Sequence, residues 1–173
     1  MCFSLYIASP LTLSEVRSMV PPGLTADLAD PATHRIFRKP WPDTQTVARL
    51  LHGACSCDLV VQRHPISRED EAWLRGRYRV LGLTREQVLR ALDNHRTALE
   101  RRPVAAGHWP VAVAEFVAEH ARNAGASVYL LHFAHDGFLP ALPATPIIER
   151  SAAEVRTASG TWLVEGQPVL VRP

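Results

Sequence analysis

The chain has 173 residues, of which 47% are hydrophobic and 21% charged, with a formal net charge of +2. This length fits one domain with its own hydrophobic core, and the near-neutral charge argues against a strongly basic nucleic-acid-binding protein. No stretch reaches the roughly 18 to 20 apolar residues that a membrane helix needs. Three cysteines are an odd number and too few for a disulfide scaffold.

The first half of the chain is predicted to contain two strands. Over residues 2–8, the apolar side chains of Phe3, Leu5 and Ile7 occupy the odd positions, which indicates a strand with one apolar face. A capping box that begins at Thr12 then predicts a short helix. Residues 21–45 hold five of the 14 prolines, so we expect a long irregular connection there before a second strand at 46–51.

The middle of the chain is predicted to be helical, with three amphipathic segments between residues 67 and 123. A strand over 127–133 follows, and its nearly continuous apolar character is typical of a central strand. A further short helix begins near Ser151, and residues 161–171 are expected to form a hairpin.

These elements together predict an α+β fold. The expected architecture is a small mixed β-sheet with the helical run 67–123 packed on one face and a C-terminal β-hairpin. We expect residues 1–173 to form a single domain, with a helical subdomain at 67–123 as the alternative. The first residues show no basic region and no cleavage pattern, so we expect no signal peptide and a cytoplasmic location. Thiols in that compartment serve metal or redox chemistry more often than structural bridges.

The main chemical feature of the sequence is the Cys-x-Cys motif at Cys55 and Cys57. Residues two apart in an extended segment point to the same face, whereas a disulfide between them would close a strained ring. Thiolates favour zinc, copper(I) or iron–sulfur chemistry, and zinc usually takes four ligands. The hypothesis is therefore one thiophilic metal ion, zinc by preference, held by Cys2, Cys55 and Cys57 with His132, or else His52, as the remaining ligand.

Two other interpretations stay open for these residues. One is a metal-free thiol enzyme, in which Cys55 or Cys57 is a nucleophile, or the two form a redox pair, and His132 or His135 acts as base. Asp136 would then orient the histidine, although Asp136 followed by glycine is also a common turn. The other interpretation is that the three thiols are unrelated and that two of them are buried as small apolar groups.

A non-enzymatic interaction module is the remaining alternative. Arginines at 75, 77 and 79 lie near Trp73 and Tyr78 in the sequence, a composition that can bind nucleic acid. Acidic residues one turn upstream are typical of a solvated helix start instead, so nucleic acid is not expected as a partner. We expect no membrane partner, while a small-molecule ligand and a homo-oligomer both stay open.

Three features together resemble a known family. They are the Met1-Cys2 start of a Leu-Tyr-Ile-Ala-Ser strand, the Cys-x-Cys motif near Gly53, and a late strand that ends in Asp136-Gly137. This combination resembles a family of small uncharacterised bacterial proteins that open with Met-Cys and carry a central Gly-Cys-Gly-Cys-Gly motif. The resemblance implies that Cys2 belongs with the Cys-x-Cys pair, and it names no reaction. The motif here is less rich in glycine, and the helical stretch 61–107 is longer.

Overall fold

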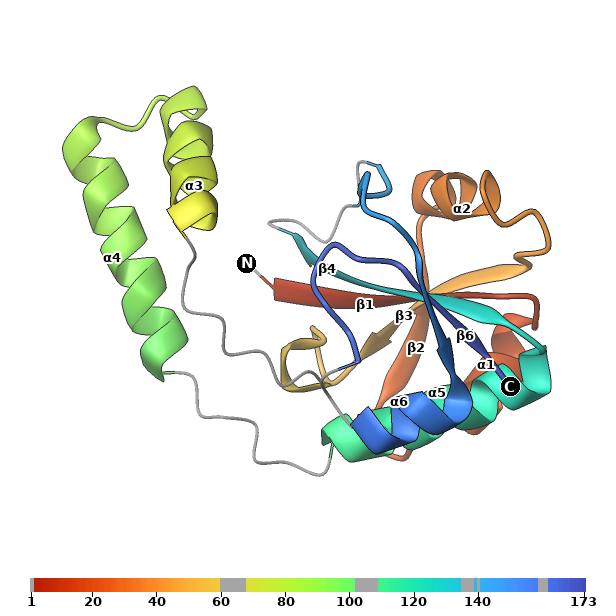
Figure 1. Cartoon of the computed structure of the whole chain (residues 1–173). Coiled ribbons are helices and arrows are strands. Elements are labelled where there is room, and N and C mark those ends of the chain that lie inside the picture. Colours follow the sequence, from red (N-terminus) through yellow and green to blue (C-terminus); the bar gives the residue numbers. More distant parts are fainter. Residues whose placement is uncertain (1, 60–67, 102–108, 135–138, 140, 159–161) are drawn as a thin grey trace. The chain divides into compact units, whose positions relative to one another are not determined.

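A computed structural model of the chain describes the backbone of residues 2–59, 68–101, 109–134, 139, 141–158 and 162–173. The chain divides into two compact units, one formed by residues 1–61 with 107–173 and the other by residues 62–106. We call the first the sheet unit, because it holds every described strand, and the second the helical hairpin (Figure 1). The helices expected over 67–123 are therefore divided between two units.

The sheet unit confirms the expected α+β class and the mixed sheet. The described strands form one six-stranded sheet in the order β2-β3-β1-β4-β6-β5, in which only the β5–β6 pair is parallel. The first predicted strand is central, with β3 on one side and β4 on the other. The strands are β1 (Cys2–Ser9), β2 (Thr25–Leu28), β3 (Thr46–Leu51), β4 (Ser127–Ala134), β5 (Ile148–Ser151) and β6 (Val169–Arg172).

The two faces of the central strand enter two separate apolar clusters. Leu5 and Ile7 belong to the larger cluster, which includes Phe116 of helix α5 (Trp109–Ala124). Tyr6 belongs to a smaller cluster on the opposite face, together with Phe37 of helix α2 (Pro31–Arg38). Figure 1 accordingly shows α5 and α2 on opposite sides of the sheet. The alternation predicted for residues 2–8 therefore matches the observed faces.

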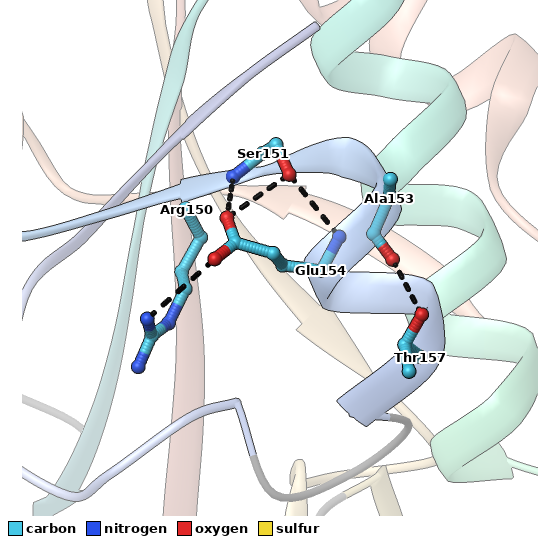
Figure 2. Close-up of polar contacts among 5 residues, drawn as sticks. All are labelled: Arg150, Ser151, Ala153, Glu154 and Thr157. Carbon is cyan, nitrogen blue, oxygen red and sulfur yellow. Dashed lines mark hydrogen bonds and ion pairs between the residues drawn. The ribbon is translucent and has the colours of Figure 1, made fainter.

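The short helices of the sheet unit are held at their starts by capping boxes. In α1 (Leu13–Met19), Thr12 and Glu15 exchange the expected pair of hydrogen bonds. Ser151 does the same for α6 (Ala152–Ala158): its hydroxyl accepts from the backbone N–H of Glu154, whose carboxylate accepts from the Ser151 N–H (Figure 2). The hydrogen bonds that the Glu154 carboxylate accepts from the N–H and the hydroxyl of Ser151 hold the pKa of that carboxyl below its ordinary value.

The irregular connection expected at 21–45 is wrong, because this stretch contains β2 and α2. Asp30 caps α2 by accepting from the N–H groups of Ala32 and Thr33, and Pro31 occupies the first turn of the helix. Proline is favoured at that position, since its fixed φ suits a helix and its missing N–H needs no partner there. Pro31 thus marks the start of a helix, whereas Pro40 and Pro42 lie in the short connection between α2 and β3.

The prediction of a C-terminal hairpin over residues 161–171 is also wrong. The final strand exists as β6, but its partners are β4 and β5, so it does not pair with the residues just before it. Trp162 and Leu163 are neighbours in sequence and are both buried in the larger cluster. Adjacent strand residues point to opposite faces, so this segment packs as core and does not form an edge strand.

The helical hairpin consists of α3 (Arg68–Val80) and α4 (Arg85–Arg101). Its small core joins Leu74 and Tyr78 of α3 to Val88 and Leu92 of α4. Gly82 lies between the helices with φ near +80°, a conformation that glycine adopts without strain. In the part of the chain that the structure describes, no helix is both long and apolar enough to cross a membrane.

Candidate thiol site at one end of the sheet

Three segments that are far apart in the sequence meet at one end of the central strands. The start of β1 pairs with the end of β4, so that Cys2 lies opposite Ala134 and Ser4 opposite His132. On its other side β1 pairs with β3, and the loop after β3 carries the Cys-x-Cys motif. The fold thus brings the backbone of Cys2, the motif loop and His132 to the same end of the sheet.

Ser56, the residue between the two cysteines, fastens the motif loop to the central strand. Its hydroxyl accepts from the N–H of Leu5 at 2.8 Å and donates to the carbonyl of Leu50 at 2.6 Å. Its own N–H donates to the carbonyl of Phe3 at 2.9 Å. Ser56 is fully buried, so its side chain replaces a direct bond between β1 and β3 at this point and determines where the cysteines lie.

The cysteines on either side of Ser56 are half-buried and carry reduced thiols. Cys57 begins a single 3-10 turn, η1 (Cys57–Leu59), and its Sγ accepts from the N–H of Phe3 at 3.5 Å. Phe3 directly follows Cys2, so the Cys57 sulfur contacts the backbone next to the third cysteine. Backbone N–H groups that donate to sulfur are a common means of stabilising thiolates bound to metals.

The two histidine candidates occupy different positions around this loop. The backbone N–H of His52 donates to the carbonyl of Cys55 at 2.8 Å, which closes a tight turn through Gly53 at φ +63°. The His52 ring lies 5.0 Å from the ring of Trp109, between centroids. His132 is half-buried and faces the same side of the sheet as its partner Ser4.

The structure brings some of the expected ligands together and leaves others undescribed. It describes the backbone of Cys2 but not its side chain, and His135 and Asp136 lie outside the described residues. Among the side chains that it does describe, no three from histidine, cysteine, aspartate and glutamate lie close enough to hold a metal ion. A metal at this end of the sheet would therefore need at least one ligand whose side chain lies outside the described set, and Cys2, His135 and Asp136 belong to that group.

A second polar cluster, at the other end of β1, was not anticipated from the sequence. The hydroxyl of Ser9 lies 2.9 Å from Nε2 of His120, and Nδ1 of His120 lies 2.5 Å from the hydroxyl of Tyr129. All three side chains are fully buried. The N–H of Leu11 donates to Ser9 and the Tyr129 hydroxyl donates to the carbonyl of Val117, so a neutral imidazole can complete an unbroken chain of hydrogen bonds.

The distances in this cluster resemble those of a nucleophile, a base and an orienting group. Its complete burial indicates a structural role instead. Burial lowers the pKa of His120 from 6.5 to about 4 and raises the pKa of Tyr129 well above its ordinary value. The imidazole is therefore neutral near pH 7, and the Ser9 hydroxyl is not exposed to a substrate. The available signal was the place of His120 on the apolar stripe of its helix, where a histidine needs buried partners.

Comparison of the sequence with models of protein families, with curated proteins and with solved structures found no match. The resemblance to small bacterial proteins that open with Met-Cys therefore stays a prediction.

Proposed function

We propose that this protein binds one thiophilic metal ion, zinc by preference, through Cys2, Cys55 and Cys57, with His132 as the fourth ligand and His52 as the alternative. The proposal places the protein in the cytoplasm, where thiols stay reduced. One observation supports it above all others: the Cys57 Sγ lies 3.5 Å from the backbone N–H of Phe3, the residue next to Cys2.

The surroundings of the cysteines suit a metal better than a disulfide. Ser56 is locked between them by hydrogen bonds to both Leu5 and Leu50, so the loop cannot easily adopt the strained ring that a Cys-x-Cys disulfide requires. Both thiols are half-buried, which leaves access for an ion while limiting exchange with water. Soft thiolate ligands with one imidazole match the preferences of zinc.

The direct test is elemental analysis of protein purified without chelators, combined with titration of the thiols. We expect about one equivalent of zinc, and Co²⁺ in its place should produce sulfur-to-metal charge-transfer absorption. Metal in excess should also stabilise the fold, by about 2.7 kcal/mol at a concentration 100 times the dissociation constant.

Variants assign the ligands. Cys2→Ser, Cys55→Ser and Cys57→Ser should each lower the affinity for zinc more than about 100-fold, since ligands matter at least as much as the groups that orient them. His34→Ala, which removes a half-buried histidine of α2 that bonds to the carbonyl of Gln45, is the matched control for His132→Ala.

Less than about a tenth of an equivalent of metal, with all three thiols freely titratable, would reject the proposal. A single cysteine that is alkylated much faster than the others would favour the metal-free thiol enzyme.

A further inference from the structure

The helical hairpin contains a basic cavity that the proposed metal site does not involve. The cavity has a volume of about 230 Å³ and is lined by Arg75 and Arg79 of α3 and by Arg85, Val88 and Leu89 of α4. Val88 is buried and forms part of the hairpin core, whereas Leu89 is 46% exposed. Three arginine side chains therefore line one small space that also has an apolar side.

The positive charge in this cavity is only partly compensated within the protein. Glu71 pairs with Arg75 across one helical turn, at 2.5 Å between Oε1 and Nη2. No carboxylate among the described side chains pairs with Arg79 or Arg85. Arg85 is also the first residue of α4, where the helix dipole adds positive potential. Like charges that share a concave site repel one another, and a bound anion relieves that repulsion.

We propose that this cavity binds the phosphate group of a small phosphate monoester whose organic part is apolar. A guanidinium donates in a planar fork that matches phosphate oxygens, and a phosphate group offers three free oxygens to three arginines where a carboxylate offers two. The cavity is smaller than the roughly 300 to 1,000 Å³ of pockets that enclose a whole ligand. It therefore holds one charged group, while the half-exposed Leu89 side chain contacts the apolar part.

The position of the aromatic residue argues for a small ligand and against single-stranded nucleic acid. Trp73 is 57% exposed, but it does not line the cavity. It lies two residues before Arg75, on the opposite side of α3, where the guanidinium of Arg77 stacks on its ring at 5.3 Å. A strand of nucleic acid needs aromatic surfaces beside its phosphate contacts, and the structure separates the two here.

The test is calorimetric titration of the full chain with phenyl phosphate, with inorganic phosphate and with a short single-stranded oligonucleotide. We expect phenyl phosphate to bind more tightly than inorganic phosphate, because only the ester contacts Leu89. Arg79→Gln and Arg85→Gln should each weaken that binding about tenfold, as expected for the loss of one charge-assisted contact.

Arg90→Gln is the matched control, because Arg90 lies on the same helix, pairs with Glu86 and does not line the cavity. It should leave binding unchanged. Arg79→Lys keeps the charge without the planar fork and should still weaken binding, which separates specific contacts from a general positive field. Circular dichroism checks that each variant is folded. Absence of binding to phenyl phosphate, an equal loss in Arg90→Gln, or tight binding of the oligonucleotide alone would each overturn the proposal.

Discussion

The two ends of the central strand β1 both depend on a buried serine, and they differ in what lies beside it. Ser9 joins His120 and Tyr129 in a network in which all three side chains are fully buried. At the opposite end, Ser56 is equally buried, but its neighbours Cys55 and Cys57 are half-exposed. Residue types that suit catalysis occur at both ends, and access to solvent separates a structural network from a candidate site.

The largest expected effect is at the buried end. His120→Ala should lower the free energy of unfolding by about 4 kcal/mol, since it removes a large buried side chain and leaves the hydroxyls of Ser9 and Tyr129 without their partner. Chemical denaturation measures the loss. His52→Ala at the thiol end, where the ring is half-buried, should cost only about 1 kcal/mol. If the two variants lost the same free energy of unfolding, the burial of the two histidines would not account for their contributions to stability.

Lowering the pH should weaken the network of His120, Ser9 and Tyr129 in the unsubstituted protein and so lower its free energy of unfolding. The pKa of His120 is about 4 in the folded protein, against 6.5 in the absence of burial, so the unfolded chain binds the proton more strongly. The stabilisation is complete above pH 6.5 and is lost as the pH falls from 6.5 towards 4, by about 3 kcal/mol in total. Denaturation curves across this range measure it.

The control for the acid effect is His120→Gln, which cannot titrate in this range. Its stability should depend much less on pH between 6.5 and 4 than that of the parent protein. A profile of unchanged slope would show that other groups cause the loss of stability.

Much of the sheet unit could be predicted from its sequence because local signals agreed with the tertiary structure. The alternation over residues 2–8 and the capping box at Thr12 both correspond to observed elements. The predictions were wrong where a residue type is common in two different kinds of local structure. Pro31 begins a helix after its Asp30 cap and does not extend a loop, and Trp162 packs into the core and does not form a strand.

For the candidate site, the sequence predicts a set of residues, and the structure describes the positions of only part of that set. Spacing alone suggested that Cys55 and Cys57 act together, and the register of β1 brings the backbone of Cys2 to the same end of the sheet. The role of Ser56 could not be foreseen, because its bonds to Leu5 and Leu50 depend on contacts between distant segments. The same holds for His120, whose partners Ser9 and Tyr129 lie on two different strands.

Ser56→Ala tests whether the thiol end depends on its buried serine. The substitution leaves the N–H of Leu5 and the carbonyl of Leu50 without the hydroxyl that joins them, so the free energy of unfolding should fall by about 2 kcal/mol. Because the motif loop is then held less firmly, Cys55 and Cys57 should react faster with a thiol reagent while the protein is still folded.

The matched control is Ser151→Ala, which removes a serine hydroxyl that also accepts a backbone N–H, at 3.2 Å from Glu154, but at the start of a helix on the surface (Figure 2). Loss of such a cap should cost about 1 kcal/mol and should leave the thiol reaction rates unchanged. If both variants lost the same stability and Ser56→Ala did not accelerate the thiols, the motif loop would be held by its other contacts. In that case strand pairing alone would position the Cys57 sulfur beside Phe3. The two ends of β1 would then differ only in how exposed their side chains are to solvent.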